Sequence, residues 1–497
     1  MRRLAVGTCA LRDRLLNAAI VRDGYTGAAA ATGGQLTGIT KMTNRLARAL
    51  NFRTGELPLG VLAACFYFCV LCGYFFLRPV REAMGVSGGI GALYWYFLTT
   101  SVASLIIVLL FGGVVSGLDR RRFIPIGYSF VIVCLIGFAA LLIADARVGG
   151  GLIGSDLETG LARGVGYTFY IWLSVINLFV NSLFWAFMVD IFNVDQGKRM
   201  FAFIGIGGTL GAIVGSWAAS FISALTESIY LPAGLMLIGA SFFGLAILMM
   251  LTLDRAAIGS AHSRLTRDST APIAKAGERI GGRFWDGATA VVTSPYLLGI
   301  GAYIVLMAIS NTMIYFAVAQ GMLDNTDTFS QRVGGFAQFD MLAQTATLIT
   351  QMFITTHLIK RLGIGWTLSL LPLVTVAGFV VLAIWPLYGV VAIFQALHRA
   401  TRYAVSRPAR ETLFSVVPPA DKYKAKPLVD VFLYRGGDVA GAGIDGALRA
   451  LGLSVTWVAA ATVPLAAVWG ALSIALSRAQ QHRDTTAGST SDSTQAT

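Results

Sequence analysis

The sequence predicts an all-α membrane protein with about twelve transmembrane helices in two six-helix bundles. Of its 497 residues, 56% are apolar and only 13% are charged. A soluble domain is typically about 45–50% apolar and ~25% charged. The apolar residues also lie in long runs, and a run of ~18 or more is long enough to cross the hydrocarbon core as a helix. This pattern excludes an ordinary soluble enzyme.

The apolar runs fall into two groups of six. The first group comprises 57–77, 91–117, 122–144, 166–190, 200–223 and 230–253. The second comprises 292–318, 335–357, 363–385, 388–415, 428–450 and 453–476. The grouping predicts an N-terminal bundle over 56–253 and a C-terminal bundle over 291–477, joined by a linker loop over 254–290.

The two ends of the chain lack such runs. Residues 1–55 carry nine Lys and Arg but two acids, without the continuous apolar core of a signal peptide. We expect a disordered cytoplasmic tail there; a second hypothesis is that translation starts at Met42. Residues 478–497 are rich in Ser, Thr, Asp and Gln, which also predicts a disordered tail.

Basic residues give the orientation, because cytoplasmic loops of membrane proteins are enriched in Lys and Arg. With both termini inside, the inner loops hold sixteen basic residues, including Arg120–Arg122 and the six in the central loop. The outer side holds about six. We therefore expect both termini in the cytoplasm, and this placement accounts for the net charge of +13 without a nucleic-acid partner.

An internal repeat relates the two halves. D-Q-G-K at Asp195–Lys198 precedes a glycine pair at 207–208, and D-K-Y-K at Asp421–Lys424 precedes a glycine pair at 436–437. Parallel six-helix halves with a site between them describe the major facilitator architecture. The superfamily's loop signature matches loosely, because Val115 stands where a glycine belongs before Asp119 and Arg120.

Several motifs carry no chemistry of their own. GIGGTLG at Gly205–Gly211 lacks the preceding strand that a dinucleotide fingerprint needs. Gly207, Gly211 and Gly215 instead recur every four residues and predict close helix packing. No Walker A sequence and no convincing metal-ligand spacing occurs, so we expect no cofactor, no metal and no enzymatic activity.

Polar residues inside the predicted spans are the informative signal, because each is costly in the membrane. They recur at steps of three and four, which places them on one face of a helix. The stripes comprise Gln395, Arg399, Arg402, Ser406 and Arg410; Asp340, Gln344, Thr347 and Gln351; Asn177 and Asn181; and Asn311 and Tyr315. They predict a shared polar interior, with helix–helix hydrogen bonding as the alternative.

The interior charges are mostly positive. Arg78 and Arg81 end the first span, and Arg399 and Arg402 lie in the tenth without an obvious local acid. Guanidinium groups form bidentate contacts with phosphate and carboxylate oxygens. These arginines therefore predict an anionic solute. Asp340 is either a proton or ion coupling site or a structural partner for one of the arginines.

Local pairing is the competing explanation for the remaining charges. Arg435 and Asp438 are spaced i,i+3, and Arg407 and Glu411 are spaced i,i+4, so both pairs fit structural ion pairs along a helix.

Three segments resemble the ATP/ADP antiporter family, the nucleotide translocases of plastids and intracellular bacteria. They are YFFLRPVREAMG (Tyr74–Gly85), NSLFWAFMVDIFNVDQGKRMFAFIGIGGTLGA (Asn181–Ala212) and SRPARETLFSVVPPADKYKAKPLVDVFLYRGGDVAGA (Ser406–Ala442). The resemblance spans both halves. It implies a major-facilitator-like fold, exchange of nucleotides, and a place in a bacterial inner membrane.

The resemblance also implies roles for single residues. Arg81 occupies the place of a basic residue, typically lysine, that closes the first span of the family, and Lys424 or Lys426 matches a lysine of the K-x-K-x-K element. Family antiporters use glutamates in the fourth and seventh spans. The matching regions here, Ser174–Asn177 and Asn311–Ile314, contain no acid, which implies a divergent member with a different substrate.

Together these features predict a monomeric secondary active transporter that moves a small anionic solute, nucleotide first, by alternating access within a lipid bilayer. The alternatives are a proton-coupled transporter of another solute with the same fold, and a membrane sensor or scaffold that does not transport. The expected substrate-binding residues are Arg78, Arg81, Asn177, Asn181, Asn311, Gln344, Arg399 and Arg402. The expected gate residues at the cytoplasmic mouth are Lys424, Lys426, Arg435 and Asp438.

Overall fold

The computed structural model describes residues 56–115, 120–265, 289, 291–418, 425–426 and 428–495. The tail 1–55 with Met42, most of the predicted linker loop, and Lys424 lie outside the described residues. The first half consists of α3 (Leu57–Ser87), α4 (Ile90–Val115), α5 (Arg120–Arg147), α6 (Gly160–Ile191), α7 (Val194–Leu225) and α8 (Leu231–Leu265).

The second half is also helical, with short π-helical stretches between its α-helices. Its elements are α10 (Pro295–Asn325), α11 (Phe329–Ile349), η1 (Thr350–Ile354), α12 (Thr355–Ile384), α13 (Tyr388–Ala400), η2 (Thr401–Ser406), α14 (Arg407–Leu413), η3 (Phe414–Val416), η4 (Leu428–Leu433), α16 (Tyr434–Ala450) and α17 (Val455–Gln495). The fold class is therefore all-α, as the apolar runs predict.

Nine helices in the described ranges are long and apolar enough to cross a membrane. The predicted spans 335–357, 388–415 and 428–450 correspond to α11, α13 with α14, and α16, which are not among the nine. Each of these three adjoins a π-helical stretch, and each carries charged side chains that lower its hydropathy. π-Bulges occur frequently at functional sites.

Two predicted boundaries differ from the structure. The first span, predicted over 57–77, continues as α3 to Ser87, so Arg78 and Arg81 lie within the helix. The C-terminal tail, predicted to be disordered over 478–497, continues α17 as a helix to Gln495. Alanine, glutamine and arginine at 478–483 are good helix formers, and the first proline of α17 lies far upstream at Pro464.

The two halves pack in the same way. In the N-terminal bundle α3 lies along α7 and α8, and in the C-terminal bundle α10 lies along α16 and α17. Glycines allow the close approach predicted for them: a Cβ at Gly211 would lie 2.2 Å from the backbone oxygen of Phe68 on α3. A Cβ at Gly441 would lie 3.1 Å from the backbone oxygen of Ile309 on α10. The internal repeat thus corresponds to a repeated helix contact.

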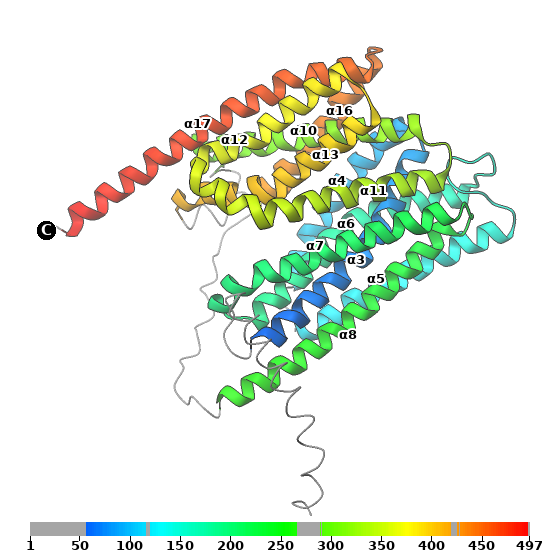
Figure 1. Ribbon diagram of the computed structural model, residues 1–497, viewed down its shortest axis with the longest axis horizontal. Helices are drawn as coiled ribbons and strands as arrows, with labels where there is room; N and C mark the ends of the chain where they lie inside the picture. The colour runs from blue at the N-terminus through cyan, green and yellow to red at the C-terminus, as the bar shows by residue number, and fades with distance from the viewer. Residues whose placement is uncertain are drawn as a thin grey trace, which may run out of the picture.

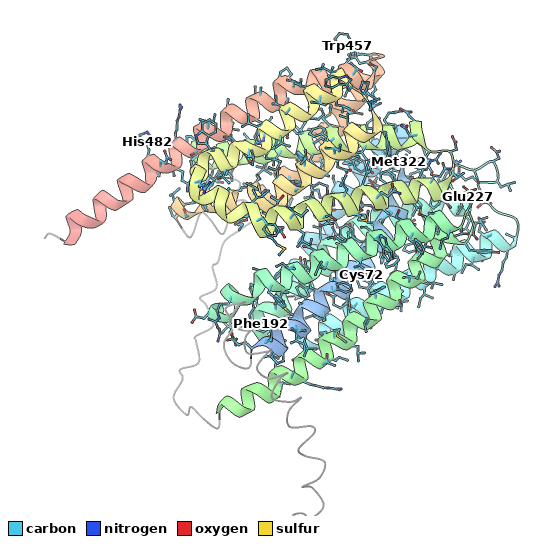
Figure 2. All side chains as sticks on the ribbon, viewed as in Figure 1. Cys72, Phe192, Glu227, Met322, Trp457 and His482 are labelled. Atoms are coloured by element: carbon cyan, nitrogen blue, oxygen red, sulfur yellow. The ribbon has the colours of Figure 1, made fainter. Side chains whose placement is uncertain are left out.

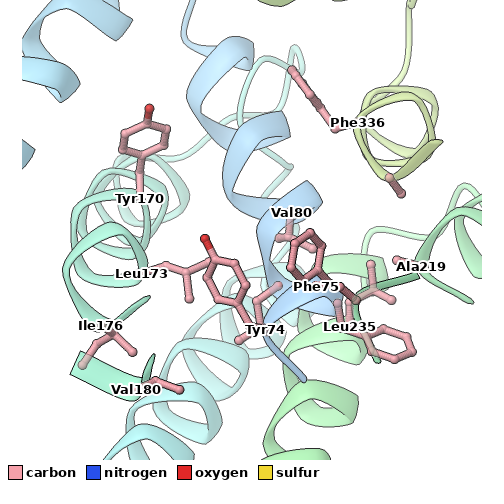
Figure 3. Close-up of a cluster of buried hydrophobic side chains, with 14 of the residues drawn as sticks. Tyr74, Phe75, Val80, Tyr170, Leu173, Ile176, Val180, Ala219, Leu235 and Phe336 are labelled. Atoms are coloured by element: carbon pink, nitrogen blue, oxygen red, sulfur yellow. The ribbon is translucent and has the colours of Figure 1, made fainter. Parts of the chain in front are cut away.

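Helix α3 forms the centre of the N-terminal core. Tyr74 points toward Leu173 on α6, while Phe75 turns toward Leu235 on α8 (Figure 3). The side chains of Tyr74 and Phe75 are buried, as are Leu173 and Leu235. Apolar contacts on both sides fix the rotation of α3, and with it the direction in which Arg78 and Arg81 point.

The bundles touch mainly through three helix pairs, α7 with α11, α3 with α11 and α4 with α16, and more lightly where α10 meets α3 and α4. They meet near the ends of α7 and α10 and diverge toward the end where α8 and α17 leave the molecule (Figure 1). Glu227 marks the end at which the bundles meet, and Phe192 marks the opposite end of the N-terminal bundle (Figure 2). A space between the bundles is therefore closed on one side by helix contacts.

Candidate functional site: a cationic cavity between the bundles

A cavity of about 920 Å³ lies between the two bundles. Its lining comes from α3, α4, α6 and α7 of the first half and from α10, α11, η1, α13, η2, α14 and α16 of the second. All eight residues that the sequence predicts for the solute line this cavity: Arg78, Arg81, Asn177, Asn181, Asn311, Gln344, Arg399 and Arg402. The structure therefore brings together residues that lie up to 324 positions apart in the chain.

The wall from α6 presents carboxamides. Asn177 and Asn181 are one helical turn apart, and Asn181 Nδ2 donates to the side-chain oxygen of Asn177 at 2.9 Å. Asn181 Oδ1 accepts from the hydroxyl of Tyr67 on α3 at 3.2 Å. Tyr67 stacks on Phe184, with ring centroids 4.1 Å apart. These contacts hold two amide groups in fixed orientations on an aromatic wall.

Arg81 reaches across to the same helix. Its Nη1 donates to Ser174 Oγ at 3.2 Å, and its guanidinium lies over the ring of Tyr170 at 5.3 Å. Arg81 Nη2 also donates to the carboxylate of Glu82. The Nε atom is buried and has no partner among the described residues.

Glu82 is a cavity residue that the sequence reasoning missed. It is 2% exposed, ion-paired with Arg81 and with Arg78 Nε at 3.6 Å, and it accepts from Tyr315 of α10 at 2.7 Å. Tyr315 also contacts Tyr170, with the two hydroxyl oxygens 3.1 Å apart. Its i,i+4 spacing from Arg78 is the signal in the sequence that could have identified it.

The arginine Arg399 has an acid partner that its own helix does not supply. Arg399 Nη1 donates to Asp340 Oδ1 of α11 at 2.6 Å, and Arg78 Nη1 donates to the same oxygen. The sequence offers Arg399 no obvious local acid, and the carboxylate that pairs with it comes from another span. Asp340 is the structural partner of two arginines in this structure.

The arginine Arg402 is held by neutral groups. Its Nη1 donates to Asn311 Oδ1 at 2.8 Å, and its Nη2 donates to the hydroxyl of Tyr434 at 2.6 Å. Its guanidinium also lies 5.3 Å from the ring centres of Tyr403 and Tyr434. The charge of Arg402 thus faces the cavity, and no carboxylate among the described residues is hydrogen-bonded to it.

The predicted gate residues separate into two places. Arg435 and Asp438 line the cavity and form an ion pair of 3.2 Å, and Thr312 Oγ1 donates to Asp438 at 3.3 Å. Lys426 is not part of the cavity lining and pairs with Glu411 at 2.6 Å.

This pairing corrects the proposed ion pair of Glu411 with Arg407. The partner of Glu411 is Lys426, whereas Arg407 lines the cavity.

Positive charge exceeds negative charge around the cavity. The arginines on its lining are Arg78, Arg81, Arg399, Arg402, Arg407 and Arg435. The carboxylates are Glu82 and Asp438 on the lining and Asp340 behind it. Because unpaired positive charge is costly in a buried site, this arrangement is suited to an anion that supplies the missing negative charge.

No family model and no curated protein matches this sequence. Solved structures do match. The nucleoside transporter NupG is 14% identical, with a TM-score of 0.53, covering 87% of this chain and 99% of that one. A bacterial homologue of the iron transporter ferroportin in an inward-facing state is 12% identical, with a TM-score of 0.60, covering 85% and 100%. A bacterial metal transporter is 13% identical, with a TM-score of 0.51, covering 83% and 98%.

These likenesses extend over most of both chains and identify the fold. The apolar helices and the paired six-helix bundles define a multi-pass membrane protein with a major-facilitator-like fold. At identities below 25%, the neighbours carry no information about which solute this chain binds.

Proposed function

We propose that the protein is a secondary transporter that moves a small organic anion by alternating access. The cavity supports this proposal because it has an excess of arginines. It also lies between the two bundles, and polar side chains from both bundles line it. Sites at the interface of two related halves are typical of transporters that rock one half against the other. We propose a carrier rather than an enzyme, because the structural neighbours are named as transporters.

The direction of the opening follows from charge. The bundles separate toward the end where α8 leads into the linker loop and where α17 ends (Figure 1). The linker is rich in basic residues, and the positive-inside rule assigns such loops to the cytoplasm. We therefore propose that both termini are cytoplasmic, that the inner membrane of a bacterium holds the protein, and that the structure is open to the cytoplasm. A monomer suffices for this mechanism.

The charge of the cavity selects among solutes. An iron or other metal cation would be repelled by the arginines, although the names of two structural neighbours refer to iron or metal transport. A nucleotide combines phosphate oxygens that suit guanidinium groups with a base that suits the amides and rings of the α6 wall. Nucleotide is thus the first candidate, supported by the resemblance to ATP/ADP antiporters. The absence of glutamate at 174–177 and 311–314 leaves ATP/ADP exchange as one choice among nucleotide-like anions.

Uptake into liposomes tests the proposal. Purified protein is reconstituted, and uptake of labelled ATP, ADP, other phosphorylated metabolites and a neutral nucleoside is compared with empty liposomes. We expect uptake of at least one anion, and loss of that uptake in the Arg402→Ala variant. Uptake of the neutral nucleoside alone would contradict the proposal.

The same liposomes separate exchange from proton coupling. If the protein exchanges anions, uptake requires an anion inside the liposome and survives a protonophore. If a proton gradient drives it, uptake survives an empty interior and stops with the protonophore.

A further inference from the structure

One carboxylate outside the cavity lining bonds to two of the arginines that line the cavity. Asp340 is 3% exposed and does not belong to the cavity lining. Its Oδ1 accepts from Nη1 of Arg78 and from Nη1 of Arg399. Arg78 lies on α3 of the N-terminal bundle, and Arg399 lies on α13 of the C-terminal bundle. A single oxygen atom therefore joins cations that belong to opposite bundles.

Both arginines also face the cavity. Each lines it, with 16% of the Arg78 side chain and 11% of the Arg399 side chain exposed. A guanidinium has five N–H donors, and the contact with Asp340 engages one nitrogen of each. An anion in the cavity would thus meet the same two cations that Asp340 holds.

Asp340 has no second set of partners. Its other oxygen, Oδ2, is buried and has no hydrogen-bond partner among the described residues. A buried carboxylate depends on its counter-charges, because without them it is left desolvated and unpaired. When either arginine turns toward an anion in the cavity, Asp340 loses stabilisation that its surroundings do not replace.

We propose that Asp340 is an internal counter-ion that competes with the anionic solute for Arg78 and Arg399. In this structure both arginines bond to Asp340. An anion that enters draws them toward itself and weakens the link from α3 to α11. Since α11 also packs on α7 at the interface of the bundles, binding favours a different arrangement of the bundles. The inference rests on the proposed function for its solute, whereas its test requires binding alone.

The sign of one measurement separates competition from a positioning role. If Asp340 oriented the arginines for the solute, its neutralisation would weaken binding. If Asp340 competes, neutralisation removes the rival and strengthens binding. Couplings between neighbouring binding events are typically 5–150-fold, so we expect a change of about tenfold.

The experiment measures the affinity of the purified full-length protein for pyrophosphate by titration calorimetry. Asp340→Asn is expected to bind about tenfold more tightly than the wild type. The matched control is Glu56→Gln, since Glu56 is also a buried acid that accepts from an arginine, Arg199 at 2.8 Å, and does not line the cavity. This control should bind as the wild type does. Equal or weaker binding by Asp340→Asn, or no binding by either protein, would overturn the proposal.

A second comparison covers the case in which Asp340→Asn does not fold. It uses a double variant that removes one positive and one negative charge together. In the double variant Arg78→Gln, Asp340→Asn, no Asp340 carboxylate competes with the solute for Arg399, whereas Arg78→Gln alone keeps that competition. The double variant should bind pyrophosphate about tenfold more tightly than the single one. Equal affinities would again overturn the proposal.

Transport kinetics provide a readout that a merely structural role would not produce. With the solute found in the liposome assay, Asp340→Asn should lower KM and also lower the maximal rate, because Asp340 no longer helps to release the solute. A structural defect would lower the rate and leave KM unchanged or raised. If the predicted ranking of affinities holds and wild-type liposomes transport nothing, the proposed function fails while this inference stands.

Discussion

Among the arginines on the cavity, Arg402 differs in that its hydrogen bonds go to neutral groups, Asn311 and Tyr434. Its charge is therefore available to a solute, whereas Arg78, Arg81 and Arg399 each share theirs with a carboxylate. The structure assigns these arginines unequal environments, although the sequence treats them as equivalent.

We predict that Arg402→Ala weakens anion binding by roughly 10- to 100-fold. Hydrogen bonds to a charged group contribute about 1.5–3 kcal/mol, and each 1.4 kcal/mol is a factor of ten. Titration calorimetry with the preferred anion measures the loss. Arg163→Ala is the matched control, since Arg163 forms an exposed ion pair with Glu158 outside the cavity and such pairs contribute little. Wild-type affinity in Arg402→Ala would remove this residue from the site.

We predict that Glu82→Gln lowers the melting temperature of the empty protein. Removing one partner of a buried ion pair typically costs about 3–5 kcal/mol, because the other charge is left uncompensated. Here Arg81 and Arg78 would both lose a carboxylate. Tyr315→Phe, which removes one hydrogen bond to Glu82, should lower the melting temperature less. A larger effect of Tyr315→Phe would show that the hydroxyl, not the ion pairs, stabilises this cluster.

For single residues, the sequence predicts that the cavity is polar and positively charged, but it does not predict which of its side chains pair with one another. Helical spacing is enough to place Asn177 with Asn181 and Arg399 with Arg402. Asp340 and Arg399 lie on different helices, and only the packing of α11 on α13 brings them together. The sequence does not predict the role of Glu82, because Glu82 accepts a hydrogen bond from Tyr315, which lies far away in the sequence on α10.

At the scale of helices, the glycines of α7 allow a direct test of packing. A Cβ at Gly211 would meet the backbone of α3 at 2.2 Å, whereas a Cβ at Gly205 has nothing within 4 Å. We predict that Gly211→Ala lowers the melting temperature sharply or prevents folding. Gly205→Ala should be neutral or slightly stabilising, because alanine is the better helix former by about 1 kcal/mol. Equal melting temperatures of the two variants would contradict the close contact of α3 and α7.

The apolar runs predict most helices correctly, since length and hydropathy are local properties. They do not predict that α3 extends beyond its apolar run, or that α11, α13 and α16 adjoin π-helical stretches. A π-helical turn depends on which neighbours a helix packs against, and hydrophobic period does not contain that information. These three helices also carry Arg399 and Asp438 on the cavity lining and Asp340, which pairs with Arg399.

At the scale of the molecule, polar contacts join the bundles at their closed end. Tyr94 of α4 donates to Asp445 of α16 at 2.9 Å, and Arg449 donates to the same oxygen at 2.7 Å. On the other side of the interface, Arg332 of α11 donates to Ser87 of α3 at 2.9 Å. Alternating access requires that these contacts break when the cavity opens on that side.

We predict that Asp445→Asn loosens the closed end. Asp445 is fully buried, and the substitution removes the charge to which Arg449 and Tyr94 bond. Spin labels at Leu225→Cys and Asn325→Cys, in a background without the native cysteines, should report longer and broader distances. Glu158→Gln, which affects an ion pair with the exposed Arg163, should leave the distances unchanged. Unchanged distances in Asp445→Asn would mean that the other contacts between the bundles, such as the α7–α11 packing and Arg332 with Ser87, keep this end closed.

Thermal stabilisation of the purified protein is the direct test of whether the cavity binds an anion. A ligand that binds only the folded state raises the melting temperature with concentration. We predict that at least one nucleotide or phosphorylated metabolite raises it in the wild type and not in Arg402→Ala, while neutral nucleosides and metal cations do not. Stabilisation by a metal cation or a neutral solute alone, with none by any anion, would contradict the account.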